Sequence, residues 1–211
     1  LYAIPEIHVR DMKITADFNY KNGNGIFSAE LDIIGECDYS VKLTLTDLNG
    51  NKVYESDKAN VRATIPSVRP WSAEEPNLYI LTAEIIAGGR IVETAETKVG
   101  FRAFELKNGL MYLNGKRIIF KGVNRHEFNA KTGRAITEED MLWDIKFIKQ
   151  NNMNAVRTSH YPNNSRWYQL CDEYGIYLID ETNLESHGTW QKMGACEPSI
   201  NVPASLPEWK E

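Results

Sequence analysis

The sequence predicts a multidomain protein, with an antiparallel β-sandwich over residues 1–102 followed by part of an α/β barrel over residues 103–211. Hydrophobic residues alternate with a period of two as far as Arg102. Beyond that residue, helical periods alternate with short apolar strands. Polar side chains follow each of these later strands, as they do where the strand ends of a barrel form a site.

Seven short strands are expected in the first region, and turn signals separate several of them. Asn22-Gly23-Asn24-Gly25, Asn49-Gly50-Asn51 and Gly88-Gly89 are typical of hairpin turns. The expected strands are Lys13–Tyr20, Ile26–Ile34, Val41–Thr46, Lys52–Glu55, Asn60–Ile65, Leu78–Ile86 and Ile91–Val99. Short strands at this spacing predict a two-sheet sandwich.

The second region predicts a hairpin and then a strand-helix-strand-helix-strand unit. The hairpin arms are Leu110–Leu113 and Lys116–Ile119, and the second arm continues into a first strand near Asn124. Next comes a helix capped by Thr137, with Asp140 completing the cap. It is followed by the strand Asn154–Thr158, the helix Ser165–Tyr174 ended by Gly175, and the strand Ile176–Ile179. The last strand is apolar throughout, which predicts that both of its faces are covered.

The polar strand ends favour a barrel over an open doubly wound sheet, because no glycine-rich phosphate loop follows the first strand. A TIM barrel needs eight strands and roughly 250 residues, whereas about 110 residues follow Arg102. We therefore expect about three of eight βα units, and we expect the chain to be a fragment of a longer protein.

Composition and charge exclude few functions. The net charge of -5 gives no reason to expect nucleic acid or a membrane surface as a partner. No apolar run of about 18 residues is present to span a bilayer. Cys37, Cys171 and Cys196 are odd in number and widely spaced, so they predict neither disulfides nor a zinc site. Cys171 lies on an amphipathic helix and is expected in the core.

Three polar clusters follow the three strands, at 124–127, 157–161 and 180–187. Two histidines at equivalent strand ends, His126 and His160, favour a site. Ion pairs that close the barrel, such as Arg125 with Glu127 or Arg157 with Asp180, are the structural alternative. Asp180 and Glu181 are neighbours on a strand and should point to opposite faces, so they cannot flank one bond.

Glu185 and His187 lie two residues apart in the loop after the third strand. A carboxylate and an imidazole could both reach one divalent ion, although two ligands alone are a weak signal. A solvated loop is the alternative.

These segments resemble glycoside hydrolase family 2, and most closely its bacterial β-galactosidases. The resembling motifs are Gly122–Glu127, Asn154–Asn163, Leu170–Tyr177 and Asp180–Gly188, with Trp71–Tyr79 and Val99–Arg102 upstream. The match is specific from about Val68 to Gly188. The run Asn183-x-Glu185-x-His187 resembles the galactosidases more than the β-glucuronidases or β-mannosidases, which remain alternatives.

The resemblance implies an immunoglobulin-like sandwich and a retaining enzyme that cleaves terminal β-D-galactosyl residues with two glutamates about 5 Å apart. It implies that His126 and His160 bind sugar hydroxyls, that Arg157 lies beside the nucleophile, and that Glu185 and His187 bind Mg²⁺. Both reacting glutamates are expected beyond Glu211, so no catalytic residue is assigned and the chain alone is expected to be inactive. A homo-oligomer is expected, and the cytoplasm is favoured over the periplasm.

A different class of function is a non-catalytic carbohydrate-binding or interaction module. Exposed aromatic residues on one face of the sandwich would favour it, with Tyr39, Tyr54 and Trp71 as candidates. Such residues are more often part of a core or an edge.

Overall fold

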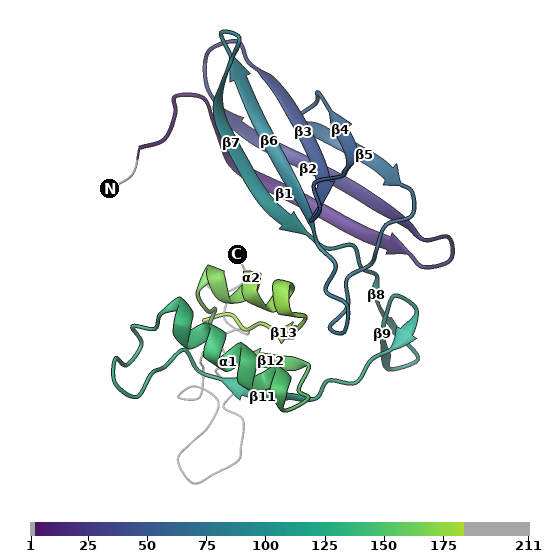
Figure 1. The fold of residues 1–211 in the computed structure, drawn as a ribbon, viewed down its shortest axis with the longest axis vertical. Coiled ribbons are helices and arrows are strands. Elements are labelled where there is room, and N and C mark those ends of the chain that lie inside the picture. Colours follow the sequence, from purple (N-terminus) through teal and green to yellow (C-terminus); the bar gives the residue numbers. More distant parts are fainter. Residues whose placement is uncertain (1–2, 184–211) are drawn as a thin grey trace, which may run out of the picture.

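The first part of the chain is a two-sheet antiparallel sandwich. The structure is a computed structural model and describes residues 3–183. One sheet has the order β1-β2-β5 and the other the order β4-β3-β6-β7 (Figure 1). The strands are β1 His8–Asn19, β2 Asn24–Ile34, β3 Ser40–Asp47, β4 Lys52–Ser56, β5 Asn60–Ile65, β6 Tyr79–Ala87 and β7 Arg90–Val99. All seven expected strands are confirmed.

The sandwich core follows from the alternation in the sequence. Along β6, Leu81, Ala83 and Ile85 are fully buried while the residues between them are partly exposed. Phe27 and Ala29 of β2 face them from the other sheet. The period of two therefore puts one face of each sheet into a common hydrophobic core.

A small three-stranded sheet in the order β10-β9-β8 follows the sandwich. Its strands are β8 Phe104–Lys107, β9 Leu110–Leu113 and β10 Lys116–Arg117. The β9–β10 hairpin was expected, but β8 was missed. Strand β8 has only four alternating residues, and its apolar side chains, Phe104 and Leu106, are exposed. So short an alternation predicts a strand only weakly.

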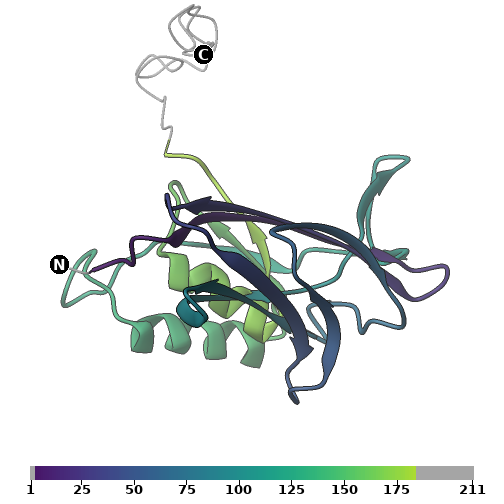
Figure 2. The ribbon, with the colours of Figure 1, turned by 90° about the horizontal axis from the view of Figure 1, so that it is seen from above.

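The last part is a parallel sheet in the order β11-β12-β13, with two helices on one of its faces (Figures 1 and 2). Its elements are β11 Gly122–Arg125, α1 Glu138–Gln150, β12 Ala155–Thr158, α2 Ser165–Tyr174 and β13 Tyr177–Ile179. Ile145, Trp167 and Leu170 of the helices pack against Val156 of the sheet. The strands lie side by side in chain order, an arrangement found both in a barrel and in one half of a doubly wound sheet.

The first helix begins where the sequence predicts, and the second begins and ends there. Thr137 caps α1, and its side chain and that of Asp140 each accept from the other's backbone N–H. Three acidic residues occupy the first turn, at the positive end of the helix dipole. Gly175 ends α2 in the left-handed conformation, with φ of 70°.

The expectation that both faces of the third strand are covered is wrong for the described residues. Leu178 faces the helices, whereas Ile179 on the other face is 45% exposed. Trp71 and Phe120 cover only the Tyr177 end of that face. An apolar strand sequence shows that both faces of the strand can be buried. It does not show which helices or strands pack against each face.

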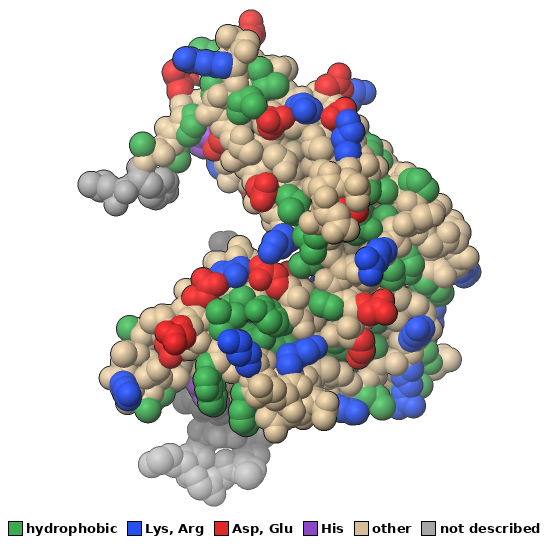
Figure 3. Space-filling view, in the orientation of Figure 1, with side chains coloured by type: hydrophobic (Ala, Val, Ile, Leu, Met, Phe, Trp, Pro, Cys, Tyr) green, Lys and Arg blue, Asp and Glu red, His purple; other side chains and the backbone are tan. Residues whose placement is uncertain are grey.

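The loop between β5 and β6 joins the sandwich to the barrel part. Trp71 Nε1 donates to the carbonyl oxygen of Asp172 at the end of α2, at 2.8 Å. Lys149 Nζ of α1 donates to the carbonyl oxygens of Ala73 and Gly175, at 3.0 and 3.2 Å. Lys98 of β7 also pairs with Glu173 of α2, at 2.9 Å. On one side of the molecule a notch opens between the two parts (Figure 3). The sandwich thus fixes the point at which β13 begins.

Within residues 3–183, no helix has both the length and the apolar character needed to cross a membrane.

Candidate functional site

The carboxyl ends of the three parallel strands lie together at one edge of the sheet. Arg125 of β11 is paired with Thr158 of β12, and Arg157 of β12 is paired with Ile179 of β13. Parallel strands in register bring the residues that follow them to the same edge. Polar segments far apart in the sequence therefore meet here.

Strand alternation divides these polar residues between the two faces of the sheet. Arg125 faces the helices, where Nε donates to Asp144 of α1 at 2.8 Å and its guanidinium lies 3.7 Å from the Trp167 ring centroid. Asp180 faces the same way and accepts from Tyr168 of α2 at 2.8 Å. These charges hold the helices onto the sheet.

The opposite face carries a cluster around Arg157. Arg157 Nε donates to Glu181 Oε1 at 2.6 Å, and a second guanidinium nitrogen lies 2.5 Å from the same oxygen. Its third nitrogen donates to Asn124 Oδ1 at 3.3 Å. His160 Nδ1 lies 3.1 Å from both Arg157 and Glu181 Oε2. We call Asn124, His126, Arg157, His160 and Glu181 the strand-end cluster.

His126 completes the cluster from the end of β11. Its ring centroid lies 5.6 Å from that of His160, with the rings nearly perpendicular. Tyr161 lies beside both segments: its hydroxyl is 3.4 Å from His126 Nδ1 and accepts from the backbone N–H of Glu127 at 3.1 Å. His126 is exposed and the His160 side chain is 39% exposed, so both imidazoles remain accessible to a polar ligand.

The charge of the cluster is balanced inside it. Partial burial pushes the pKa of the Glu181 carboxyl up, but hydrogen bonds from Arg157 and His160 outweigh that effect and lower the pKa overall. Glu181 is therefore ionised at neutral pH. A fixed cation, a fixed anion and two imidazoles at one edge can bind and orient a ligand rich in hydroxyl groups.

The structure brings together the predicted binding residues His126, His160 and Arg157, and it corrects one predicted ion pair. Arg157 pairs with Glu181 and not with Asp180. Glu181 lies two residues after Ile179 and so shares the face of Arg157, while Asp180 points to the helices. The expected opposition of Asp180 and Glu181 is confirmed.

The predicted pair of Arg125 and Glu127 is present but secondary, with Nη1 and Oε1 3.6 Å apart. The same nitrogen donates to Asn163 at 2.7 Å. Arg125 is 7% exposed, so its role is structural.

The predicted metal ligands Glu185 and His187 lie outside the described residues. Within residues 3–183, no three His, Cys, Asp or Glu side chains are placed to hold a metal ion.

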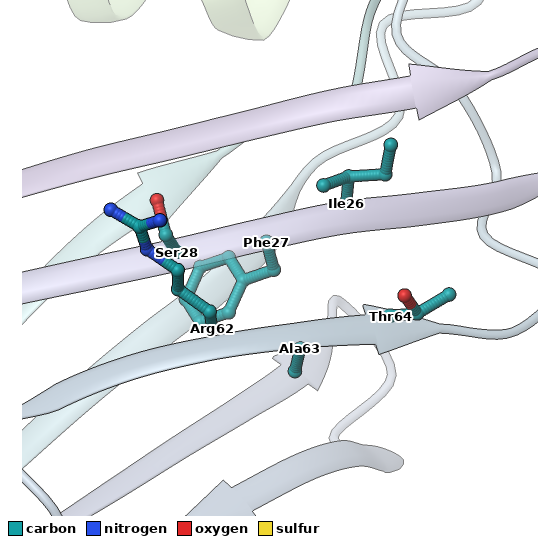
Figure 4. Close-up of a pocket in the computed structure, with 6 residues that line it drawn as sticks. All are labelled: Ile26, Phe27, Ser28, Arg62, Ala63 and Thr64. Atoms are coloured by element: carbon teal, nitrogen blue, oxygen red, sulfur yellow. The ribbon is translucent and has the colours of Figure 1, made fainter.

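Other candidates do not form a site. Trp71 is 2% exposed and Tyr54 packs against the sandwich core, so they do not join Tyr39 in an aromatic platform. Cys171 is buried, and burial raises its thiol pKa to about 12. A pocket on the sandwich sheet has one ionisable lining residue, Arg62 (Figure 4). Its lining is Ile26, Phe27, Ser28, Arg62, Ala63 and Thr64.

Glu181 and Asn124 were not assigned roles from the sequence. The signal that could have found them is the combination of strand register and alternation. Both residues share the face of Arg157: Asn124 lies on β11, and Glu181 follows β13.

Comparison with known families matches both parts of the chain. The profile described as glycosyl hydrolases family 2 matches residues 7–102, and that of the TIM barrel domain of the same family matches residues 104–211. The chain belongs to glycosyl hydrolase family 2. Its first part is the family's sandwich domain, and its second is a portion of the family's TIM barrel domain.

The relatives that this chain matches are named β-galactosidase. It is 56% identical to a β-galactosidase of Streptococcus thermophilus over 99% of its length and to one of Clostridium acetobutylicum over 100%. It spans 21% and 24% of those proteins. It is also 48% identical to a β-galactosidase large subunit of Lactobacillus acidophilus, of which it spans 35%.

Among solved structures, this chain is similar to a β-glucuronidase of Ruminococcus gnavus in complex with a C6-substituted uronic isofagomine. The TM-score is 0.78 at 28% identity, covering 85% of this chain and 30% of that one.

Proposed function

We propose that the protein containing this chain hydrolyses terminal β-D-galactosyl residues from β-galactosides. The observation that carries the proposal is the strand-end cluster, in which two accessible imidazoles and a fixed guanidinium meet at the edge of a parallel sheet. The relatives named β-galactosidase, at 56% identity, support the choice of sugar.

In this proposal, His126 and His160 hydrogen-bond hydroxyl groups of the galactosyl ring. Each neutral imidazole offers one donor and one acceptor, which suits hydroxyls that can do both. Arg157 stays positive and favours the ionised form of a neighbouring carboxylate nucleophile. The two reacting glutamates of a retaining mechanism would come from later barrel strands, outside these 211 residues.

Mg²⁺ is part of the proposal, with Glu185 and His187 as two of its ligands. A carboxylate oxygen suits this hard cation, and the imidazole nitrogen is a softer ligand that would need further oxygen ligands beside it. The ion would add positive charge beside the sugar.

Three finer structural points are also proposed. The sandwich is immunoglobulin-like, supported by its β1-β2-β5 and β4-β3-β6-β7 sheets, which correspond to an A-B-E sheet and a sheet containing C-F-G. The three parallel strands are the first three of eight barrel units, supported by their sequential order. The domains meet between residues 102 and 103. A homo-oligomer remains a prediction that sedimentation of the complete protein checks.

A β-glucuronidase activity is the second candidate, favoured by the likeness to the Ruminococcus gnavus enzyme. A glucuronide carries a carboxylate that needs a cationic partner. The guanidinium within the strand-end cluster, that of Arg157, is already paired with Glu181. This pairing favours the neutral galactoside.

The test is hydrolysis of nitrophenyl β-galactoside and nitrophenyl β-glucuronide by the complete protein. We expect turnover of the galactoside and a loss of about 10- to 100-fold in kcat/KM for His160→Ala, the size of a lost hydrogen bond to a charged or strongly polar group. His8→Ala is the matched control, because His8 contacts Pro5 in the N-terminal segment. Preferred turnover of the glucuronide, or equal loss in both variants, contradicts the proposal.

A second assay uses the 211-residue chain alone, produced in a host that lacks its own β-galactosidase. We expect no turnover, because the proposal assigns both reacting glutamates to other residues. Measurable hydrolysis would show that the reacting groups lie within these 211 residues.

A further inference from the structure

Glu181 contacts both polar neighbours of the strand-end cluster at once. Its Oε1 accepts from Arg157, and its Oε2 lies 3.1 Å from His160 Nδ1. The guanidinium thus contacts one carboxylate oxygen, and the imidazole contacts the other.

The same imidazole nitrogen faces two opposite demands. Arg157 has only donors to offer, whereas the Glu181 carboxylate has only acceptors, and both lie 3.1 Å from His160 Nδ1. An unprotonated Nδ1 would place its lone pair against the lone pairs of the carboxylate. A protonated Nδ1 makes a charge-assisted hydrogen bond to Glu181. Arg157 then does not donate to Nδ1, and it keeps its two contacts to Oε1.

We propose that Glu181 is a positioning residue that holds His160 in the Nδ1–H tautomer, so that Nε2 presents an acceptor to a sugar hydroxyl. Within residues 3–183, the polar contacts of this ring, to Arg157 and to Glu181, are all made by Nδ1, and Nε2 makes none. The histidine then accepts from the substrate, and it rejects a ligand that offers only an acceptor at that place. This inference rests on the proposed function for the identity of the ligand.

The backbone fixes Glu181 for this role. Its N–H donates to Thr158 Oγ1 at 3.1 Å, and Thr158 is fully buried. The Thr158 hydroxyl in turn donates to Asp180 Oδ1 at 2.9 Å. A buried hydroxyl on β12 thus anchors the residue after β13, and alternation aims the two neighbouring carboxylates at opposite faces.

Asp180 provides a matched control for Glu181. It is the adjacent carboxylate on the same segment, but its partners are Thr158 and Tyr168 on the helix side. Asp180→Asn removes a charge of the same sign, one residue away. The amide Oδ1 can still accept from Thr158 and Tyr168, so the anchor of Glu181 and the contacts of His160 stay in place.

The first measurement is the tautomer of His160 by ¹⁵N NMR of the histidine-labelled chain, with the resonances assigned by a His160→Gln variant. We expect a protonated Nδ1 and an unprotonated Nε2 in the wild type and in Asp180→Asn. Glu181→Gln should shift the population toward Nε2–H, because a side-chain amide can donate to Nδ1. A wild-type Nε2–H tautomer overturns the inference, as does a tautomer that Glu181→Gln leaves unchanged.

The second measurement is steady-state hydrolysis of nitrophenyl β-galactoside by the complete protein. Glu181→Gln should lower kcat/KM by about 10- to 100-fold, mainly through kcat, and Asp180→Asn by less than about threefold. If Glu181 acts through His160, the double variant with His160→Ala should lose less than the product of the two single losses.

Multiplicative losses, or unchanged kinetics in Glu181→Gln, overturn the role of Glu181. An inactive wild-type protein overturns the proposed function and leaves the tautomer result to decide this inference. Should Glu181→Gln fail to fold, Glu181→Asp keeps the charge but retracts it by one methylene, and the same two readouts apply.

Discussion

Alanine at Gly175 tests how the sandwich sets the start of β13. Gly175 has a φ of +70°, and a Cβ at this position would overlap the carbonyl oxygen of Ala73 and lie 2.9 Å from its carbonyl carbon. Both of these atoms are backbone, so no side chain can move aside. The loop between β5 and β6 must shift, or the junction of α2 and β13 must.

The expected cost has two parts. A non-glycine residue in the left-handed region costs roughly 1–2 kcal/mol. Forcing an extra carbon into a packed site costs roughly 1–3 kcal/mol more. We therefore expect Gly175→Ala to lower the free energy of unfolding by about 2–5 kcal/mol.

Gly133→Ala is the matched control for this substitution. Gly133 has a φ of +66°, and a Cβ there meets nothing within 4 Å. The control carries the backbone cost alone, about 1–2 kcal/mol. The difference between the two variants isolates the contact with Ala73.

Urea unfolding followed by tryptophan fluorescence gives both values, because Trp71 and Trp167 lie on either side of the junction. The wild type and both variants are compared at one pH and salt concentration. Equal losses in Gly175→Ala and Gly133→Ala would refute the reasoning, since the sandwich loop would then not press on Gly175 in solution.

Acid should weaken the strand-end cluster, because the pKa of Glu181 is lowered from its usual 4.5. Its stabilising contribution is complete above about pH 4.5 and is lost as the pH falls through the lower folded-state pKa, so urea titrations of Glu181→Gln should depend less on acid. Thr137→Ala should cost about 1 kcal/mol in urea unfolding, because the side-chain half of the α1 cap with Asp140 is lost. Exposed Cys37 should react with iodoacetamide in the native protein, whereas Cys171, with a pKa of about 12, should react only on unfolding, as peptide mass spectrometry would show.

The outcomes that would contradict these predictions are equally specific. Identical acid dependence in wild type and Glu181→Gln would mean that the carboxyl is not held ionised by its neighbours. A loss below about 0.3 kcal/mol for Thr137→Ala would mean that water replaces the cap. Labelling of Cys171 in the native state at the rate of Cys37 would mean that α2 opens readily.

Local patterns predicted the elements well where the chemistry is local. The cap at Thr137 and the left-handed end at Gly175 set both helices, and each depends on residues within one turn. The strand β8 was missed because four alternating residues with exposed apolar side chains carry little pattern. The coverage of Ile179 was mispredicted, because an apolar strand does not specify its neighbouring layers.

The sequence predicted which residues form the candidate site better than it predicted their contacts. His126, His160 and Arg157 were expected at one edge, and they meet there. The ion pair that the sequence suggested as a structural alternative joined Arg157 to Asp180, whereas the partner of Arg157 is Glu181. The partner of Arg157 depends on the register of β12 against β13. That register decides which residue after β13 lies on the same face of the sheet as Arg157.

By itself, the sequence determined every described helix and strand except β8, the order of the sandwich and the barrel part, and the residue types at the strand ends. Periodicity, caps and turn residues act over a few positions, so they can be read without coordinates. Only the tertiary structure decided that Glu181 binds both Arg157 and His160 and that a loop of the sandwich fixes the start of β13. Those contacts join segments more than 20 residues apart, and their free energy depends on register and packing, which no local pattern contains.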